Sequence, residues 1–230
     1  MPTAPTPPLL AALRAGTRDL HDRTEAAFVL GGPVVTRAVY ADVLARLASY
    51  YVRAEAALAP WAPPLAAVGL DLAARQKAPL LHRDLDVLGA GGATPGGMVA
   101  ALDAVVEFHV SSAAHALGVA YVLEGATLGG QILRRRLGPA LGLTPEAGLA
   151  FFGAYGADVG SMWRAFTAAV ERFDAATPPD GRPVAHAAAV ATARATFLAF
   201  ERDVVTPTAA PTFHRVPGPV PGLLPAHAAG

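Results

Sequence analysis

The chain has 230 residues, and its 18 lysines and arginines balance its 18 aspartates and glutamates, so the formal net charge is zero. This length suits one domain with a substantial core. The charge balance argues against nucleic acid as the main partner, because phosphate binding normally appears as an excess of basic residues. The absence of cysteine from the sequence excludes disulfides, thiolate metal ligands and a cysteine nucleophile.

The two ends of the chain are predicted to be flexible tails around one folded domain. Residues 1–8 hold four prolines, and residues 206–230 hold six prolines and few apolar anchors, a composition typical of mobile segments. The N-terminal stretch has no basic region followed by an apolar core, and no uncharged apolar run reaches the roughly 18 residues of a membrane span. We therefore expect a domain over residues 9–205 in a cytoplasmic protein that has no membrane partner.

Between the tails, the sequence predicts an all-α fold. Alanine and leucine dominate, charged residues are scattered at i, i+3 and i+4 spacings, and strand-like alternation is absent over any useful length. Prolines and glycines separate the apolar segments, as in PWAPP at 60–64 and TPPDGRP at 177–183. These segments should pack as a single-domain multi-helix bundle. The predicted helices are 9–29, 36–59, 65–75, 79–88, 96–111, 113–136, 145–155, 157–175 and 184–204.

The first predicted helix carries a histidine close to its apolar stripe. Thr17, His21 and Glu25 follow at i, i+4 and i+8, and Arg14 lies seven residues before His21, so all four share one face. A carboxylate that binds the second ring nitrogen of a histidine fixes its tautomer and makes it a better metal ligand. The same spacing also fits a half-buried structural histidine with a surface acid one turn later, which is the commoner case. The spacing alone leaves both explanations open.

A later helix, predicted over 113–136, is unusually rich in glycine. Gly118, Gly125 and Gly129 are spaced seven and four apart and so share one face, although each glycine in a helix interior costs about 1 kcal/mol relative to alanine. A face without side chains lets a flat ligand lie against the backbone, and it also permits a kink. Close packing against another helix through small residues explains the pattern equally well.

Two motifs, in this order along the chain, resemble those of heme oxygenases. LRAGTRDLHDRTE at 13–25 is similar to the family's proximal-helix motif, L-R-x-x-T-x-x-x-H-x-x-x-E, and YVLEGATLGGQIL at 121–133 is similar to its kinked distal helix, with a G-x-x-x-G-G core. The stretches 77–89 and 151–166 resemble the bacterial branch associated with bacteriophytochromes. The resemblance covers most of 9–204, and it implies an all-α bundle of the heme oxygenase type with a kinked, glycine-rich distal helix.

On the proximal side, the resemblance implies that His21 is the axial ligand of the heme iron through Nε2 and that Glu25 accepts the other ring N–H. Thr17 belongs to the same motif and is expected in the heme-binding set. Arg14 matches a basic position used near a heme propionate, and Arg164 on a later helix is a second candidate for that task. Charged donors suit carboxylates at the rim of a pocket.

On the distal side, the resemblance implies that Gly125 and Gly129 line the face above the heme. Dioxygen bound there would be directed toward one meso carbon of the ring, because no bulky side chain intervenes. Gly130 completes the motif and helps the helix to bend.

One position departs from the family pattern. Many members have aspartate directly after the first distal glycine, where it anchors a water network that delivers protons, and this chain has Ala126 there. Thr127 offers a hydroxyl for such a network, and Glu124 or another acid offers a different one. The departure bears on the efficiency and the regiochemistry of the reaction more than on the identity of the ligand.

The activity that the resemblance implies is oxidative cleavage of heme to biliverdin, with release of CO and ferrous iron. Heme would be both substrate and cofactor, and the electrons would come from an external reductant of the ferredoxin or flavodoxin type. A phytochrome that accepts biliverdin is a further implied partner. The basic run at 134–136 either complements the negative end of its helix or forms a docking patch for an acidic reductase.

Three other functions compete with this one. Ala126 motivates a non-catalytic protein of the same fold that binds heme or another tetrapyrrole. The presence of both His21 and Glu25 argues against a helical scaffold that has lost heme. A carboxylate-bridged di-iron bundle needs E-x-x-H pairs on several helices, and His109 and His115, six residues apart, belong to no such pair.

Overall fold

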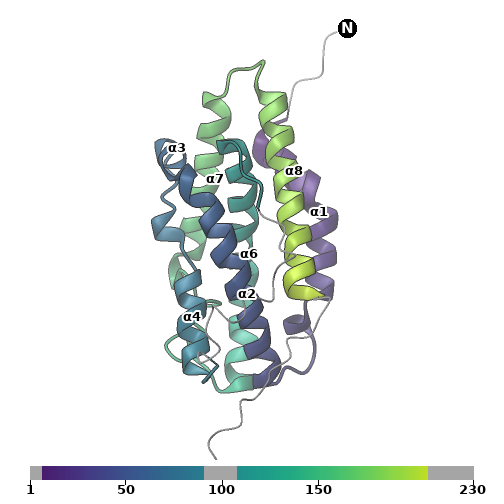
Figure 1. The fold of residues 1–230 in the computed structure, drawn as a ribbon, viewed down its shortest axis with the longest axis vertical. Helices are drawn as coiled ribbons and strands as arrows, with labels where there is room; N and C mark the ends of the chain where they lie inside the picture. The colour runs from purple at the N-terminus through teal and green to yellow at the C-terminus, as the bar shows by residue number, and fades with distance from the viewer. Residues whose placement is uncertain (1–6, 91–107, 207–230) are drawn as a thin grey trace, which may run out of the picture.

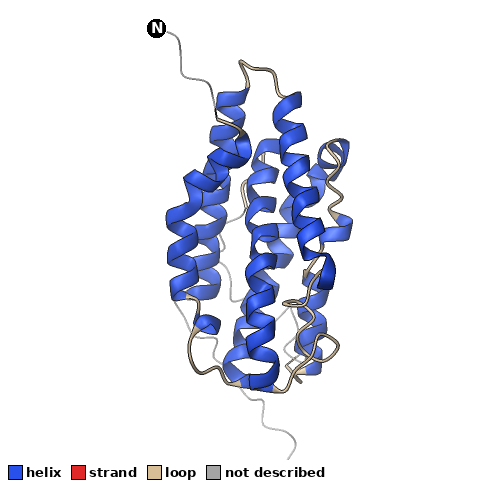
Figure 2. Ribbon diagram, turned by 180° about the vertical axis from the view of Figure 1, so that it is seen from behind, coloured by secondary structure: helices blue, strands red, loops and turns tan. Residues whose placement is uncertain are grey.

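The computed structural model describes residues 7–90 and 108–206, and helices dominate this part of the chain (Figure 1). No described residue belongs to a β-strand (Figure 2). A short π-helical turn, Glu201–Val205, follows the last helix. The α-helices are α1 (Leu9–Ala27), α2 (Arg37–Leu58), α3 (Ala62–Ala67), α4 (Ala78–Val87), α6 (Ala113–Leu141), α7 (Val159–Ala176) and α8 (Arg182–Phe200).

Hydroxyl side chains begin two of the long helices. The Thr36 hydroxyl accepts a hydrogen bond from the backbone N–H of Val39 at 3.2 Å and starts α2, and Ser112 does the same for His115 at 3.4 Å at the start of α6. Such caps satisfy a backbone donor that has no partner inside the helix. The prediction of an all-α bundle is confirmed, with most helix boundaries within a few residues of the structure.

The predicted helix over 145–155 is wrong. The structure folds this segment into turns, and two of its residues, Gly148 at φ 92° and Tyr155 at φ 65°, adopt the left-handed conformation, which no right-handed helix accommodates. The buried carboxylate of Asp84 accepts two backbone N–H groups of the segment, at 2.7 and 2.8 Å. These hydrogen bonds come from 66 and 67 residues away in the sequence, so local propensity gives no sign of them. We call residues 150–155 the strap, because they lie along α6.

Three other boundaries differ from the prediction. The glycine-rich helix is predicted to end at 136, but α6 continues through Pro139 to Leu141 and is terminated by Gly142, which has a left-handed φ of 63°. Pro139 is exposed, so the carbonyl that loses its helical hydrogen bond there faces solvent rather than the core. The segment 65–75 is split between the end of α3 and a 3₁₀ turn at Ala73–Arg75. The predicted helix over 96–111 lies mostly outside the described residues, and 108–111 is not helical.

Helix α8 packs against both α1 and α6, and it contacts each through a glycine. A Cβ placed on Gly16 of α1 would lie 2.5 Å from the Val190 side chain, and one placed on Gly118 of α6 would lie 2.3 Å from the carbonyl oxygen of Ala189. Figure 1 shows α1 and α8 side by side, and these two helices make one of the largest contacts in the bundle. The helices that carry the proximal and distal motifs are therefore both positioned by α8.

Helix α2 packs across α4 and α6 and adds buried tyrosines to the core. Tyr50 donates its hydroxyl to the carbonyl of Thr196 on α8 at 3.1 Å, and Tyr40 donates to the carbonyl of Gly148 at 2.7 Å. Both hydroxyls are thus satisfied inside the protein, as buried polar groups require. The hydrogen bond of Tyr40 also fixes the segment that precedes the strap.

By length and composition, α6 could cross a membrane, but its surroundings are those of a core helix. Its most apolar 18-residue window has a mean hydropathy of 1.3, and 61% of that window is buried inside the protein. This burial accounts for the apolar composition without a membrane.

The carboxylate of Asp174 on α7 forms hydrogen bonds with the start of α1 and with α8. These hydrogen bonds make the stability of the fold depend on pH. Burial alone would raise the pKa of Asp174, but hydrogen bonds from the Leu9 N–H at 2.9 Å and the His186 ring at 2.7 Å hold the pKa below its usual value. A lowered pKa stabilises the fold above the ordinary aspartate pKa, and the stabilisation is lost as pH falls through the lowered value. We expect Asp174→Asn to reduce stability by about 1 kcal/mol at pH 7 and by less at pH 3, as measured by urea unfolding. An equal loss at both pH values would contradict this assignment.

Candidate functional site

The proximal motif places His21 on the exposed side of α1. The stripe of buried leucines on this helix faces the core, and the His21 side chain is 60% exposed. Its Nδ1 lies 3.9 Å from a Glu25 carboxylate oxygen and 3.4 Å from one of Asp22. The ring packs edge-on against Phe197 of α8, with 6.3 Å between centroids. Both carboxylates face Nδ1, so Nε2 is the nitrogen left for an external ligand.

The structure does not bring every predicted proximal residue to the same face. Thr17 is buried, and its hydroxyl donates to the Leu13 carbonyl at 2.8 Å, so it supports the helix rather than His21. Arg14 is exposed, as a residue at a pocket rim would be. One turn after His21, Thr24 donates to the carboxylate of Glu201 at 3.1 Å and joins α1 to the turn after α8.

The three spaced glycines of α6 have different surroundings, although they share a face. Gly118 lies against the backbone of α8, as helix packing through small residues predicts. A Cβ on Gly125 would come no closer than 4.0 Å to Trp163 of α7, and a Cβ on Gly129 would meet no described atom within 4 Å. Helix packing therefore explains Gly118, while no described atom comes closer than 4.0 Å to the Cβ position of Gly125 or Gly129.

Exposed apolar side chains flank the two open glycines. Leu128 is 40% exposed and Ile132 is 60% exposed, and both lie on the same side of α6 as Gly125 and Gly129. We call these four residues the open face of α6. Exposed apolar surface next to bare backbone is typical of a site for a flat, apolar ligand.

The remaining distal residues point elsewhere. Gly130 is buried, and a Cβ there would contact Phe152 of the strap at 3.6 Å. Thr127 is buried on another side of α6, and its hydroxyl donates to the Glu124 carbonyl at 2.6 Å. The structure thus does not bring Thr127 to the open face. Ala126 is exposed to solvent.

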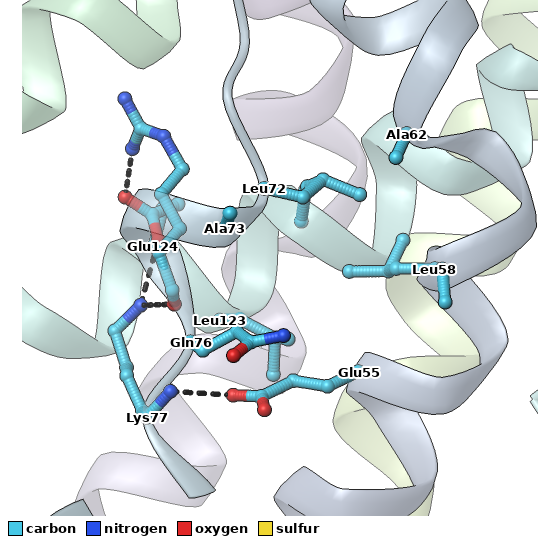
Figure 3. Close-up of a pocket in the computed structure, with 12 residues that line it drawn as sticks. Glu55, Leu58, Ala62, Leu72, Ala73, Gln76, Lys77, Leu123 and Glu124 are labelled. Atoms are coloured by element: carbon cyan, nitrogen blue, oxygen red, sulfur yellow. Dashed lines mark hydrogen bonds and ion pairs between the residues drawn. The ribbon is translucent and has the colours of Figure 1, made fainter. Parts of the chain in front are cut away.

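Sequence reasoning missed a buried ionic cluster beside the glycines. The carboxylate of Glu124 is bonded to Arg75, to the Lys77 ammonium at 2.7 Å and to the Tyr155 hydroxyl at 2.9 Å. We call these four residues the Glu124 cluster; Figure 3 shows the hydrogen bond that the Lys77 ammonium donates to Glu124. The one sequence signal for this cluster was an acidic residue within an apolar helix. Its partners could not be predicted, because they come from segments far away in the sequence. The carboxylate is bound within this cluster, which leaves it unavailable as a substitute at Ala126.

A small cavity lies next to this cluster (Figure 3). Its volume is about 190 Å³, and its lining includes Glu55, Leu58, Gln76, Lys77 and Leu123. Leu123 lies about 160° around α6 from Gly125 on a regular helix, so the cavity is behind the open face. A tetrapyrrole is larger than this cavity, and the open face remains the better candidate for a flat ligand.

The structure also bears on the basic run at 134–136 and on the alternative of a di-iron site. Arg136 donates to the carbonyls of Gly31 and Gly32, so part of the basic run 134–136 holds the loop after α1. Among the described residues, no group of three or more histidines and acids could hold a metal ion. His115 instead shares a 2.6 Å hydrogen bond with Ser112 at the start of its helix.

Comparison with known proteins decides the family. The family model described as heme oxygenase matches residues 7–206. The chain belongs to the heme oxygenase family. The fold agrees: the crystal structure of the NO- and CO-bound heme oxygenase from Neisseria meningitidis superposes with a TM-score of 0.67 and 20% identity, over 89% of this chain and 96% of that one. No curated protein sequence matches the chain.

The described residues of this heme oxygenase family member fit a heme. His21 offers an imidazole nitrogen at the protein surface, next to carboxylates that orient the ring. The open face of α6 offers bare backbone and apolar side chains for a flat ring. Arg14 and Arg164 are both exposed and can approach carboxylates at a rim. The protein offers one imidazole as a metal ligand. This suits an iron that a porphyrin already holds, because such an iron requires few further ligands from the protein.

The different surroundings of the glycines generate a paired prediction. Gly118→Ala should destabilise the protein by about 2 kcal/mol or more, because the new methyl group would clash with the α8 backbone. Gly129→Ala should leave stability unchanged or raise it by up to about 1 kcal/mol, since the methyl group meets open space and alanine favours the helix. Urea unfolding of the heme-free variants measures both effects. Equal destabilisation by the two substitutions would refute the different roles.

Proposed function

We propose that the protein is a heme oxygenase that cleaves heme to biliverdin, releasing CO and ferrous iron with dioxygen and external electrons. The observation that carries the proposal is the open face of α6, where among the described residues a Cβ on Gly125 would reach only Trp163, at 4.0 Å, and a Cβ on Gly129 would meet nothing within 4 Å. Membership of the heme oxygenase family supports heme degradation at the family level. When bound, the heme supplies the redox-active iron and the ring that is oxidised.

In this proposal, His21 binds the iron through Nε2. The carboxylate of Asp22, 3.4 Å from Nδ1, is within hydrogen-bond distance of the ring nitrogen, and the carboxylate of Glu25, 3.9 Å away, would accept the ring N–H after a small side-chain movement. This interaction fixes the tautomer that leaves Nε2 free for the metal, and it makes the imidazole more electron-rich. Phe197 limits the tilt of the ring by its edge-on contact.

On the other side, Gly125 and Gly129 keep the space above the ring free of side chains, so that a small ligand has room beside the backbone. Leu128 and Ile132 keep bulk water away from part of this face. Gly130 faces the strap, where a Cβ would make an ordinary contact with Phe152 at 3.6 Å. The kink of this helix stays a prediction.

Proton supply takes a different route from that of family members with an aspartate after the first distal glycine. Ala126 is exposed, so solvent water can reach this position without an acid to hold it. The hydroxyl of Thr127 already donates to a backbone carbonyl. Any part that Thr127 plays must therefore be as an acceptor, and the same holds for Thr17 on the proximal side.

Propionate contacts, partners and location complete the proposal. Arg14 and Arg164 would bind the two heme carboxylates from opposite helices. Electrons would come from a ferredoxin- or flavodoxin-type reductase, and biliverdin would pass to a phytochrome, as in the bacterial branch that the sequence resembles. The buried environment of α6 is consistent with a cytoplasmic protein.

A non-catalytic heme-binding protein is the second candidate, because Ala126 removes the usual anchor of the water network. Turnover separates the two functions. We expect one equivalent of hemin, with ascorbate and an iron chelator in air, to give a Soret band that decays while the broad red absorption of biliverdin grows. A Soret band that persists, or that bleaches without biliverdin, would show binding without ordered cleavage.

The ligand assignment has its own test. His21→Ala should abolish the axial imidazole signature in the ferric heme spectrum, and added imidazole should restore it. The matched control is His82→Ala, which removes an exposed histidine from α4 and should leave the spectrum unchanged. An unchanged spectrum in His21→Ala would overturn the assignment of His21.

A further inference from the structure

Glu124 occupies a special position in α6, directly before the first open glycine. It is 3% exposed, and its carboxylate is bonded to two cations and a phenol. A buried carboxylate needs such partners, because an unpaired one carries a large desolvation cost. The acid is therefore part of a cluster that has to form together with this part of the helix.

The cations of the cluster are themselves fixed to other elements. Lys77 donates from its ammonium group to the Arg75 carbonyl at 2.9 Å and from its backbone N–H to the carboxylate of Glu55 on α2 at 2.6 Å. Arg75 donates to the carbonyl of Met162 on α7 at 3.2 Å. Glu124 is thus connected through its partners to α2, to the start of α4 and to α7, as Figure 3 shows for Lys77 and Glu55.

The phenol of the cluster comes from a strained residue. Tyr155 has a φ of 65°, and it is a non-glycine residue in the left-handed region. This conformation costs energy, and it persists where surrounding contacts determine it. The hydroxyl donates to the Glu124 carboxylate at 2.9 Å and accepts from the Lys77 ammonium at 3.0 Å. The same ammonium lies 4.8 Å from the ring centroid.

The strap that carries Tyr155 also holds α6 two turns later. Gln131 is buried, and its amide donates to the carbonyls of Phe152 and Ala154 at 3.5 and 3.3 Å. Glu124 and Gln131 are seven residues apart and lie on one side of α6. The two attachments enclose the stretch 125–130, which contains the open glycines.

This stretch needs an external support. Its three glycines weaken the helix by about 1 kcal/mol each relative to alanine, and Gly125 and Gly129 make few packing contacts on their own face. Successive residues of a helix are about 100° apart around its axis, so the Glu124 side chain points about 100° away from Gly125. It therefore anchors the helix without covering the open face.

We propose that Glu124 is a positioning residue that fixes the rotation and the height of the glycine stretch 125–130 through its bonds to Arg75, Lys77 and Tyr155. The proposal deepens the function proposed above, because the backbone it fixes is the one that would face the heme. Glu124 itself touches neither the ligand nor the reacting atoms.

The first test measures the helix in the heme-free protein. Glu124→Gln keeps the shape of the side chain but leaves two cations without a charged partner. We expect backbone amides in 125–131 to exchange hydrogen at least about tenfold faster, because local opening becomes easier, while those of α1 and α8 change little. An unchanged rate in 125–131, or an equal rise in all helices, would overturn the proposal.

The matched control removes another ion-paired carboxylate, one that is partly buried. Asp203 accepts from Arg53 of α2 at 2.7 Å and from Arg202 at 2.6 Å, within the turn after α8. Asp203→Asn should leave exchange in 125–131 unchanged. If Glu124→Gln does not fold, Tyr155→Phe replaces it, since this variant retains both ion pairs and loses one hydroxyl. It should raise exchange in the same stretch by a smaller factor, and no rise would count against the proposal.

The second test uses a spectroscopic probe that a merely stabilising role would not move. In the reduced, heme-loaded protein with CO, Glu124→Gln should split or broaden the C–O stretching band, because the backbone facing the CO becomes heterogeneous. Asp203→Asn should leave the band unchanged. Faster exchange with an unaltered band would show that Glu124 only stabilises the helix, which overturns its positioning role. If the wild-type protein binds no heme, the proposed function fails, while hydrogen exchange still decides whether the cluster anchors the helix.

Discussion

The arrangement of this protein depends on the close approach of α8 to two other helices. At Gly16 and at Gly118, any side chain would collide with α8, so α1 and α6 lie as near to it as their backbones allow. The approach sets the position of His21 relative to the core, because the opposite side of α1 is packed. It also sets the point along α6 beyond which the described residues leave Gly125 and Gly129 without close packing. One helix thus positions both predicted sides of the ligand site.

The open face creates a second requirement. A helix segment that lacks side chains toward its ligand loses packing there, and the surrounding protein has to compensate from other directions. In this structure the compensation is polar: Glu124 and Gln131 bind the strap and the cations near α4. A polar attachment is directional, whereas apolar packing alone permits sliding. This property suits a helix whose exact height matters for a ligand.

Local sequence signals predicted most of the helices and the two motifs, because apolar periodicity and glycine spacing are properties of neighbouring residues. The failures have long-range causes. The helix predicted over 145–155 gave way to the strap because Asp84, more than 60 residues earlier, accepts its N–H groups. The end of α6 was misplaced because a solvent-facing proline is tolerated where a buried one is not.

The candidate site was predicted in the same uneven way. His21 and the open glycines could be found from spacing together with the family resemblance, and the assignment of their roles stays a prediction. The separation of Gly118 from Gly125 could not be found, because the three glycines look alike until α8 is in place. The Glu124 cluster joins Glu124 to Arg75, Lys77 and Tyr155, which are 49, 47 and 31 positions away, and a single acid in an apolar helix gives no indication of such partners.

The position of α8 near the end of the described chain has a consequence for biosynthesis. Of the described helices, α1 leaves the ribosome first and α8 last, so α1 emerges well before the helix that covers Gly16. The nascent chain therefore exposes the leucine stripe of α1 until residues 182–200 have emerged. The two predicted sides of the ligand site therefore cannot assemble until α8 has emerged, and a heme that meets the chain before then would find only half of the predicted site.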